Sequence, residues 1–277
     1  MSARYLARSA DGRALLGDDE GYVPLDTADP SLRSVDDALR AAPDGLPDPD
    51  GATASRRLAE HLGFASPIER PGKLFGIGLN YADHATDLDE VRPDEPASFF
   101  KPATAATGPG GPIRLPPAEI SDRVTAEAEL AVVIGRTCRD VPEERVDEVV
   151  AGYVPVIDMT AEDILERNPR FLTRSKSFDT FLVFGPRIVV PDDDLAIGNL
   201  DDVEVRTVVD DEVIAENTVS NMLFRPHELV SFHSSVMTLE PGDVISTGTP
   251  GAGVIRPGDS VRAEVDSVGT VHADVVR

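Results

Sequence analysis

Apolar, β-branched segments separated by turn residues constrain the fold of this chain more than any other feature. Strands buried on both faces are expected at EAELAVVIG (127–135), GYVPVIDM (152–159) and FLVFGPRIVV (181–190). A hairpin is expected at 203–218, where two β-branched runs flank an Asp-Asp-Glu turn. The pattern predicts a β-rich α+β fold.

The first seventy residues have a different composition. Expected there are short strands near 4–7 and 22–25, a helix near 35–41, a Pro-, Gly- and Asp-rich connector, and a helical segment with one apolar face at 55–62. Elsewhere, helices are expected near 143–151, 160–167 and 225–237. Because a new strand, KLFGIGLN, starts at residue 73, we predict a small N-terminal β-containing domain at 1–70 and a second domain at 71–277.

The charge balance excludes several classes of protein. The chain has 50 Asp+Glu against 26 Lys+Arg, a formal net charge of −24. Phosphate backbones and anionic lipids are bound by clusters of Lys and Arg, so neither nucleic acid nor a membrane surface is an expected partner. The acidic excess and the scarcity of lysine favour a halophilic archaeal protein over an acidic protein of a GC-rich bacterium.

The compartment is expected to be the cytoplasm. Cys138 is the single cysteine, so no disulfide can form within the chain. The N-terminus lacks the apolar core of a signal peptide, and no apolar run is long enough to span a bilayer.

Three carboxylates form a candidate metal site. Glu127 and Glu129 are two residues apart on an expected strand, so both point to one face, and Asp158 follows the apolar run VPVI. Oxygen ligands without a Cys or His cluster suit Mg²⁺, Mn²⁺ or Ca²⁺. The alternatives stay open: acidic pairs arise by chance in so acidic a chain, and Asp158 could instead be the N-cap of a helix starting near Thr160.

Other polar residues are candidates for substrate chemistry. His84 and Asp87 would share a face of a helical turn and could activate a water, although a loop histidine is more often a bystander. Lys176 suits recognition of an anion or a carbonyl, or else a plain salt bridge. Thr249 lies in STGTPGAG, a loop suited to a carboxylate but without the spacing of a phosphate-binding P-loop.

Taken in order, these segments resemble the fumarylacetoacetate hydrolase family over 71–277. The matching stretches are RPGKLFGIGLNYADHA (70–85), FFKPATAATGPGGPI (99–113), EAELAVVIG (127–135), GYVPVIDMTAED (152–163), KSFDTF (176–181) and LEPGDVISTGTPGAGV (239–254).

The resemblance implies a mixed β-roll and a homodimer. It implies Mg²⁺ or Mn²⁺ held by Glu127, Glu129 and Asp158. Lys176 and Thr249 would then contact the substrate, and His84 with Asp87 would activate water from a lid.

The same resemblance implies an enzyme acting on 2-oxo acids. The leading hypothesis is hydrolysis of a C–C bond in an acylpyruvate-like 2-oxo acid through a metal-bound enolate. The alternatives are an isomerase or decarboxylase of 2-hydroxydienoic acids or oxaloacetate, as in aromatic catabolism, and a non-catalytic member that binds a 2-oxo acid. Glu162 and Leu165 stand where relatives carry Arg and Gln, which argues against a dicarboxylate substrate.

Overall fold

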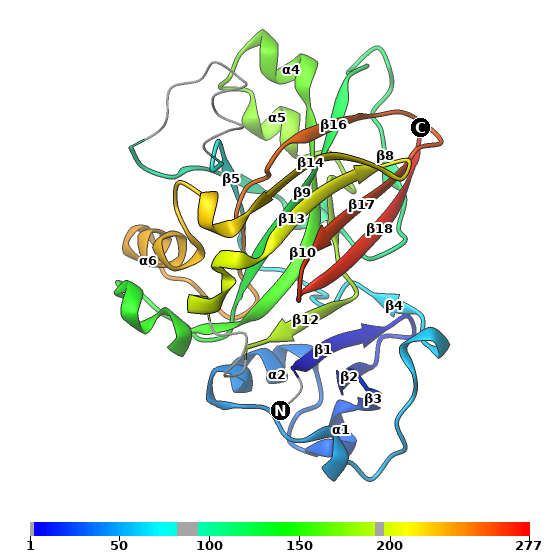
Figure 1. The fold of residues 1–277 in the computed structure, drawn as a ribbon, viewed down its shortest axis with the longest axis vertical. Coiled ribbons are helices and arrows are strands. Elements are labelled where there is room, and N and C mark those ends of the chain that lie inside the picture. Colours follow the sequence, from blue (N-terminus) through cyan, green and yellow to red (C-terminus); the bar gives the residue numbers. More distant parts are fainter. Residues whose placement is uncertain (1–2, 82–93, 192–196) are drawn as a thin grey trace.

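The fold is β-rich α+β, as predicted. The computed structural model describes residues 3–81, 94–191 and 197–277. Within these ranges the strands form a thirteen-stranded sheet and a five-stranded sheet. Figure 1 shows the N-terminal segment at one end of the molecule and two short helices, labelled α4 and α5, at the other.

The N-terminal segment contributes a small antiparallel unit to the larger sheet. Its elements are β1 (Arg4–Ser9), β2 (Ala14–Asp18), β3 (Gly21–Pro24), α1 (Leu25–Ala28), α2 (Val35–Ala41), three 3₁₀ turns (Ala42–Asp44, Pro49–Gly51, Ala59–His61) and β4 (Phe64–Ala65). The Ser34 side chain caps α2 by accepting a hydrogen bond from the backbone N–H of Asp37. The Asp37 side chain in turn accepts from the backbone N–H of Ser34, which completes a capping box.

The middle of the chain supplies the strands at the centre of the fold. These are β5 (Leu74–Gly78), β6 (Ala97–Lys101), β7 (Ala106–Thr107), β8 (Ile113–Arg114), β9 (Val124–Ile134), β10 (Val150–Ala161), β11 (Leu182–Phe184) and β12 (Arg187–Val190). Between them lie two 3₁₀ segments (Ala103–Ala105, Glu143–Glu148) and the helices α4 (Glu162–Arg167) and α5 (Leu172–Lys176).

The C-terminal part forms most of the second sheet. Its elements are two 3₁₀ segments (Ile197–Asp202, Val219–Asn221), β13 (Glu204–Val209), β14 (Glu212–Thr218), α6 (Pro226–Val236), β15 (Val244–Ser246), β16 (Ala252–Ile255), β17 (Ser260–Val265) and β18 (Gly269–Val276). No helix in the described part of the chain is long and apolar enough to cross a membrane.

Nine strands of the larger sheet follow the order β3-β2-β1-β12-β10-β9-β15-β5-β6, and its other four strands, β4, β7, β11 and β16, pair off this path. The smaller sheet has the order β14-β13-β17-β18-β8. β1 pairs antiparallel with β12, so the N-terminal strands continue the sheet that contains β9 and β10. β9 and β10 are antiparallel along almost their whole length, and every residue of both strands is buried. This pair is the central ladder of the molecule (Figure 1).

Alternation along β9 separates its side chains into two groups. Ala126, Ala128 and Leu130 pack in one hydrophobic cluster, while Ala131 and Val133 belong to a second. The carboxylates at 127 and 129 share the face of the second cluster, as expected from their spacing. The apolar runs therefore place two acidic side chains at the edge of a core.

The structure corrects three predicted helices. Residues 55–62 form only the turn Ala59–His61, because Arg57 exchanges backbone hydrogen bonds of 2.8 and 2.9 Å with Tyr22 and stays extended. Residues 143–151 form the 3₁₀ segment Glu143–Glu148 before β10 begins. The third helix starts at Glu162, because residues 160 and 161 still pair with β9.

The structure corrects one strand prediction and confirms a hairpin. The run at 181–190 is divided into β11 and β12, since Gly185 and Pro186 interrupt it. The hairpin at 203–218 is confirmed as β13 and β14. Asp210 and Asp211 lie between these strands at φ values of +49° and +67°, the conformation that a tight hairpin turn requires.

Candidate metal centre and active site

Glu127, Glu129 and Asp158 lie together on the central ladder. Asp158 is directly opposite Glu127 across the β9–β10 pair, so their side chains share a face. One carboxylate oxygen from each residue lies within 4.8 Å of the others, and all three side chains are buried. The alternative that Asp158 is a helix N-cap is wrong, because it lies within β10 and the N-cap of α4 is Ala161.

Hydrogen bonds hold Glu127 and Glu129 in fixed orientations. Thr160 Oγ1 donates to Glu127 Oε1 over 2.6 Å, and Lys176 Nζ lies 2.9 Å from Glu127 Oε2. Glu129 Oε2 accepts from Ser246 Oγ at 2.5 Å and from the backbone N–H of Gly248 at 2.8 Å. Both acids are thus positioned by neighbours outside β9.

Asp158 retains a free coordination position. Its Oδ1 lies 2.7 Å from Lys101 Nζ and 3.6 Å from Lys176 Nζ. Its Oδ2 is buried and has no hydrogen-bond partner among the described residues. A buried carboxylate oxygen without a donor is costly unless a cation binds it, so this donor set fits a divalent metal.

The electrostatics of the cluster favour a bound cation. Burial, with the charges of Asp158 and Glu127 nearby, raises the pKa of Glu129 to about 8. Burial is the largest single influence on Glu127, but the charge of Lys176 and the hydrogen bonds from Thr160 and Lys176 together outweigh it and hold the pKa of that carboxyl below its ordinary value. When all three carboxylates are ionised they outnumber the two ammonium groups, and this excess negative charge attracts a cation.

Lys101 is a site residue that the sequence analysis missed. It ends β6, is almost fully buried, and contacts Asp158 as described above. Lysine is rarely buried without a partner. Two signals in the sequence were available: the chain has only three lysines, and Lys101 lies within the family-matching stretch 99–113.

Lys176 lies beside the carboxylate cluster, and its contact with a substrate remains a prediction. It ends α5, and its ammonium lies between Glu127 and Asp158 and 4.9 Å from the centre of the Phe99 ring. The nearby negative charges of Asp158 and Glu127 overcome the effect of burial and raise the pKa of Lys176 above its ordinary value. The side chain is therefore a cation beside the carboxylates.

Thr249 lies in the loop between β15 and β16, the loop that also binds Glu129. Its Oγ1 donates to the carbonyl of Gly251 over 2.9 Å and accepts from the backbone N–H of the same residue. The hydroxyl thus stabilises its own loop, and its contact with a substrate carboxylate remains a prediction.

Glu162 lies at the outer end of the same face. Thr125, which precedes Glu127 by two residues on β9, donates its hydroxyl to Glu162 Oε1 over 3.0 Å. Burial, and then the charge of Glu127, raise the pKa of Glu162. No ion pair to Glu162 occurs within the described ranges, although Lys176 and Arg123 act on it electrostatically.

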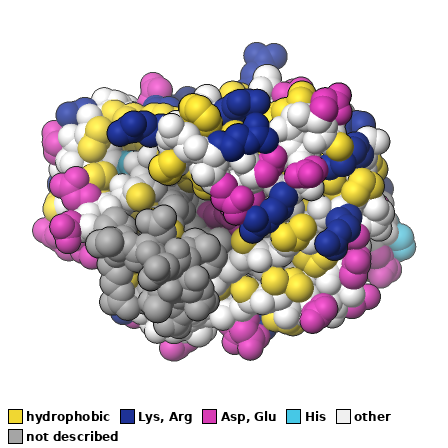
Figure 2. Space-filling model, turned by 90° about the horizontal axis from the view of Figure 1, so that it is seen from above, with side chains coloured by type: hydrophobic (Ala, Val, Ile, Leu, Met, Phe, Trp, Pro, Cys, Tyr) yellow, Lys and Arg dark blue, Asp and Glu magenta, His cyan; other side chains and the backbone are white. Residues whose placement is uncertain are grey.

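The predicted water-activating pair, His84 and Asp87, lies outside the described residues. Figure 2 shows the face that carries α4 and α5. This face is hollowed near its centre, and both acidic and basic side chains border the hollow.

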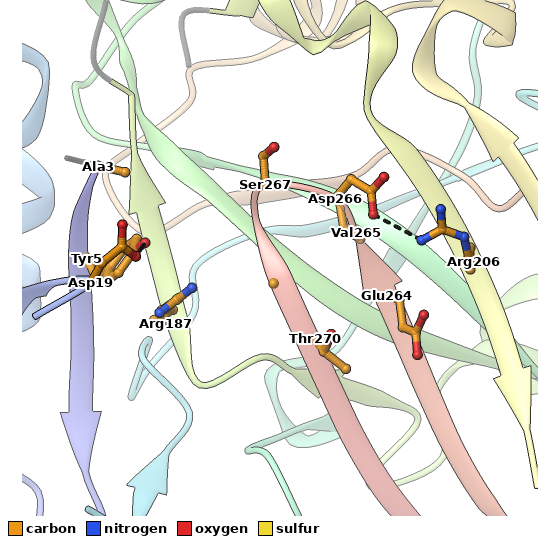
Figure 3. Close-up of a pocket in the computed structure, with 11 residues that line it drawn as sticks. Ala3, Tyr5, Asp19, Arg187, Arg206, Glu264, Val265, Asp266, Ser267 and Thr270 are labelled. Carbon is orange, nitrogen blue, oxygen red and sulfur yellow. Dashed lines mark hydrogen bonds and ion pairs between the residues drawn. The ribbon is translucent and has the colours of Figure 1, made fainter. Parts of the chain in front are cut away.

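A separate cavity of about 530 Å³ lies between β1 and the turn that joins β17 to β18 (Figure 3). Arg187 covers the Tyr5 ring at 3.7 Å on one side, and Arg206 pairs with Asp266 at 3.0 Å on the other. None of the three clustered carboxylates lines this cavity. The site assignment therefore rests on the central ladder.

The buried carboxylates on a β-rich α+β scaffold form a candidate oxygen-ligand cation site. The particular family follows from comparison with known proteins. The family model described as fumarylacetoacetate (FAA) hydrolase C-terminal matches residues 73–276, and the chain belongs to this family.

Three similar proteins illustrate the range of the family. A mitochondrial oxaloacetate tautomerase of Xenopus laevis is 34% identical over 94% of this chain and 84% of its own length. The structure of 5-carboxymethyl-2-hydroxymuconate delta-isomerase from Mycobacterium smegmatis is 37% identical, with a TM-score of 0.78 and full coverage of both chains. Maleylpyruvate hydrolase from Sphingobium sp. SYK-6, in complex with manganese(II) and pyruvate, is 29% identical, with a TM-score of 0.78 and 98% coverage of both chains.

Proposed function

We propose that this chain is a divalent-metal-dependent hydrolase that cleaves a C–C bond in an acylpyruvate-like 2-oxo acid. The observation that carries the proposal is the cluster of three buried carboxylates, one of which has an unpartnered oxygen. Membership of the family and the manganese complex of the maleylpyruvate hydrolase support the metal requirement.

Glu127, Glu129 and Asp158 would hold Mg²⁺ or Mn²⁺, both of which prefer oxygen ligands. When bound, the ion supplies a positive charge that stabilises the negative charge developing on the 2-oxo oxygen of the substrate. The three carboxylates are buried and already oriented. The site would therefore not need to reorganise its polar groups as the negative charge develops during the reaction.

Lys176 would bind and orient the anionic end of the substrate. Its ammonium is fixed by Glu127 and lies at the edge of the cluster, where a carboxylate or a polarised carbonyl can accept from it. Thr249 would bind the substrate carboxylate from the neighbouring loop. His84 with Asp87 would remove a proton from the attacking water.

The proposed hydrolysis proceeds through an enolate of pyruvate. Water adds to the distal carbonyl, the bond between the acyl carbon and the methylene carbon breaks, and its electron pair remains on the pyruvate half as an enolate. A proton then adds to that carbon, which gives pyruvate and the released carboxylic acid. Lys176, as a cation, favours the state in which this half carries the extra negative charge.

The charge of the site favours a substrate with a single carboxylate. Glu162 places another acid beside Thr125, and no Arg or Lys of the described residues forms an ion pair with it. A second substrate carboxylate at this end would meet a like charge, which disfavours dianions.

Keto-enol isomerisation or decarboxylation is the second candidate. Several similar proteins are an isomerase, a tautomerase or a bifunctional isomerase/decarboxylase by name. These reactions need the same stabilised enolate but no attacking water, so they would use the ladder residues without the pair His84 and Asp87.

A substrate panel tests both candidates. The purified protein is assayed with Mg²⁺ or Mn²⁺ for pyruvate release from acetylpyruvate and from oxaloacetate, and for ultraviolet loss of a dienol. Metal-dependent hydrolysis of acetylpyruvate, lost in Glu127→Ala and in Asp158→Ala, is the expected result. Faster turnover of oxaloacetate or the dienol would favour the second candidate, and full activity of either variant without metal would overturn the site.

A non-catalytic protein that binds a 2-oxo acid is the third outcome. It would show no turnover of any substrate in the panel with either metal. Pyruvate or oxalate binding in the presence of Mn²⁺, measured by calorimetry, would then define the protein as a binding member of the family.

A further inference from the structure

Lys101 makes more contacts than a charge partner of Asp158 needs. Its ammonium donates to three backbone carbonyl oxygens, those of Met159 at 3.2 Å, Lys176 at 2.6 Å and Phe181 at 2.9 Å. An ammonium group has three N–H bonds, and with Asp158 Oδ1 at 2.7 Å it faces four acceptors, so every N–H bond has a partner.

The three carbonyls belong to three different segments of the chain. Met159 lies in β10, Lys176 ends α5, and Phe181 precedes β11. Lys101 approaches them from the end of β6, which lies 58, 75 and 80 residues away along the chain. One side chain therefore ties the metal-binding strand to the segment that carries the substrate-binding lysine.

Asp158 is held by charge in addition to this network. Its Oδ1 lies 2.7 Å from Lys101 Nζ, and both side chains are almost completely excluded from solvent. Lys101 contacts only Oδ1 of this carboxylate, and Asp158 Oδ2 has no partner among the described residues. The carboxylate is attracted to the ammonium without losing its free oxygen.

We propose that Lys101 is a positioning residue that orients Asp158 toward the metal and fixes the backbone of Lys176. It does not touch the substrate, since all of its donors are used. The metal-related part of this inference rests on the proposed function, but its tests measure binding and stability instead of turnover.

A simple counter-charge would behave differently from a positioning residue. If Lys101 only contributed positive charge, its removal would leave the cluster more negative, and a divalent cation would bind more tightly. If Lys101 positions Asp158, its removal lets the carboxylate reorient, and the cation binds more weakly. Loss of a residue that orients a metal ligand typically costs about 10–100-fold in affinity.

Calorimetric titration with Mn²⁺ separates these cases. Lys101→Met is expected to weaken Mn²⁺ binding at least about tenfold. Lys73→Met is the matched control, because Lys73 pairs with Asp243 at 2.6 Å away from the cluster and its loss should leave the affinity unchanged. Unchanged or tighter binding in Lys101→Met would overturn the proposal.

Lys101→Arg tests geometry at constant charge. The planar guanidinium cannot offer its donors to three carbonyls that surround a compact ammonium, so Mn²⁺ affinity should stay low. Full affinity in Lys101→Arg would show that charge alone suffices, and the positioning role would be wrong.

Unfolding of the metal-free protein provides a measurement that needs no ligand. Lys101→Met leaves Asp158 buried without its nearest cation, so it should cost much more stability alone than in an Asp158→Asn background. The double variant keeps the test decisive if Lys101→Met folds poorly. Additive losses in the double-mutant cycle, measured by urea in EDTA, would contradict the pairing.

Enzyme kinetics test whether Lys101 fixes the position of Lys176. Lys101→Met should raise KM and lower kcat together, since both the substrate-binding lysine and the metal ligand shift. Assays at saturating Mn²⁺ isolate the effect of the shifted Lys176, because the metal site is then filled. An unchanged KM under these conditions would show that Lys101 does not position Lys176. Failure of the proposed reaction itself would leave the Mn²⁺ titration and the stability cycle intact as tests.

Discussion

Gly248 donates its backbone N–H to Glu129 Oε2 over 2.8 Å from a backbone φ of +96°. A Cβ at this position would lie 2.8 Å from Asn80 Cβ and 3.0 Å from the carbonyl of Ile77. Both the conformation and the close approach therefore require glycine. The orientation of Glu129, a proposed metal ligand, depends on a residue without a side chain.

Gly248→Ala should destabilise the protein and weaken metal binding. The unfavourable conformation costs about 1–3 kcal/mol, and displacement of Asn80 adds to it. Because the N–H moves with the backbone, Mn²⁺ affinity should fall about tenfold. Urea unfolding and calorimetry measure the two effects.

Gly258→Ala provides the control for conformation alone. Gly258 has a φ of +99°, and no atom lies within 4 Å of the place its Cβ would occupy. This variant should lose stability but keep its Mn²⁺ affinity. Equal stability losses at Gly258 and Gly248 would contradict the steric part of the explanation.

The metal-free protein should become less stable as pH rises toward 8. The pKa of Glu129 is raised from 4.5 to about 8, so between these values the folded chain keeps a proton that the unfolded chain has released. The free energy of unfolding therefore falls as pH increases through this range. Urea unfolding in EDTA at a series of pH values measures the slope.

Metal binding should remove the proton that Glu129 keeps in the metal-free folded protein. At pH 7, Mn²⁺ must displace the proton from Glu129, so binding releases protons and becomes tighter toward pH 8. Calorimetry in two buffers with different ionisation enthalpies counts the protons. In Glu129→Gln the decline of stability should flatten, and a profile identical to that of the wild type would assign it to another group.

Glu162→Gln should relax the selection against dicarboxylates. Removal of one negative charge should raise kcat/KM for oxaloacetate relative to acetylpyruvate at least about tenfold, or ~1.4 kcal/mol. The ratio of the two kcat/KM values is the measurement. Glu166→Gln is the control, because Glu166 lies on the same helix, is exposed and pairs with Arg123 at 2.6 Å. An unchanged ratio in Glu162→Gln would place Glu162 outside substrate selection.

Arg56→Met should destabilise the N-terminal segment without affecting metal binding. Both terminal nitrogens of Arg56 contact the buried Asp18, and Arg56 also pairs with Asp50 at 2.7 Å. The isolated Asp18 charge should cost about 2–3 kcal/mol. Arg13→Met, which breaks an exposed pair with Asp26, should cost less than about 1 kcal/mol. Equal losses would show that burial of Asp18 contributes little.

The fold could be predicted where burial alone determines the pattern. The apolar runs of β9 and β10 leave no alternative to buried strands, and the Asp-Asp turn of the β13–β14 hairpin is a local signal. The helix prediction for 55–62 was wrong because the backbone of Arg57 pairs with Tyr22, a contact that side-chain periodicity cannot reveal.

The site could be predicted where its residues share one strand. Alternation placed Glu127 and Glu129 on one face, and the apolar run before Asp158 indicated a buried acid. Lys101 was missed because its partners are mostly backbone carbonyls, which every residue has and no sequence pattern marks. Long-range contacts of this kind become visible only in the folded chain.

β10 ends at Ala161 and α4 begins at Glu162, four residues after Asp158. The strand is held by partners on both sides, whereas α4 has six residues and carries exposed side chains. If Glu162 selects the substrate as proposed, one substitution at the start of α4 changes substrate choice and leaves β10 in place. Descendants of this chain could diversify in substrate at that position while inheriting β10 unchanged.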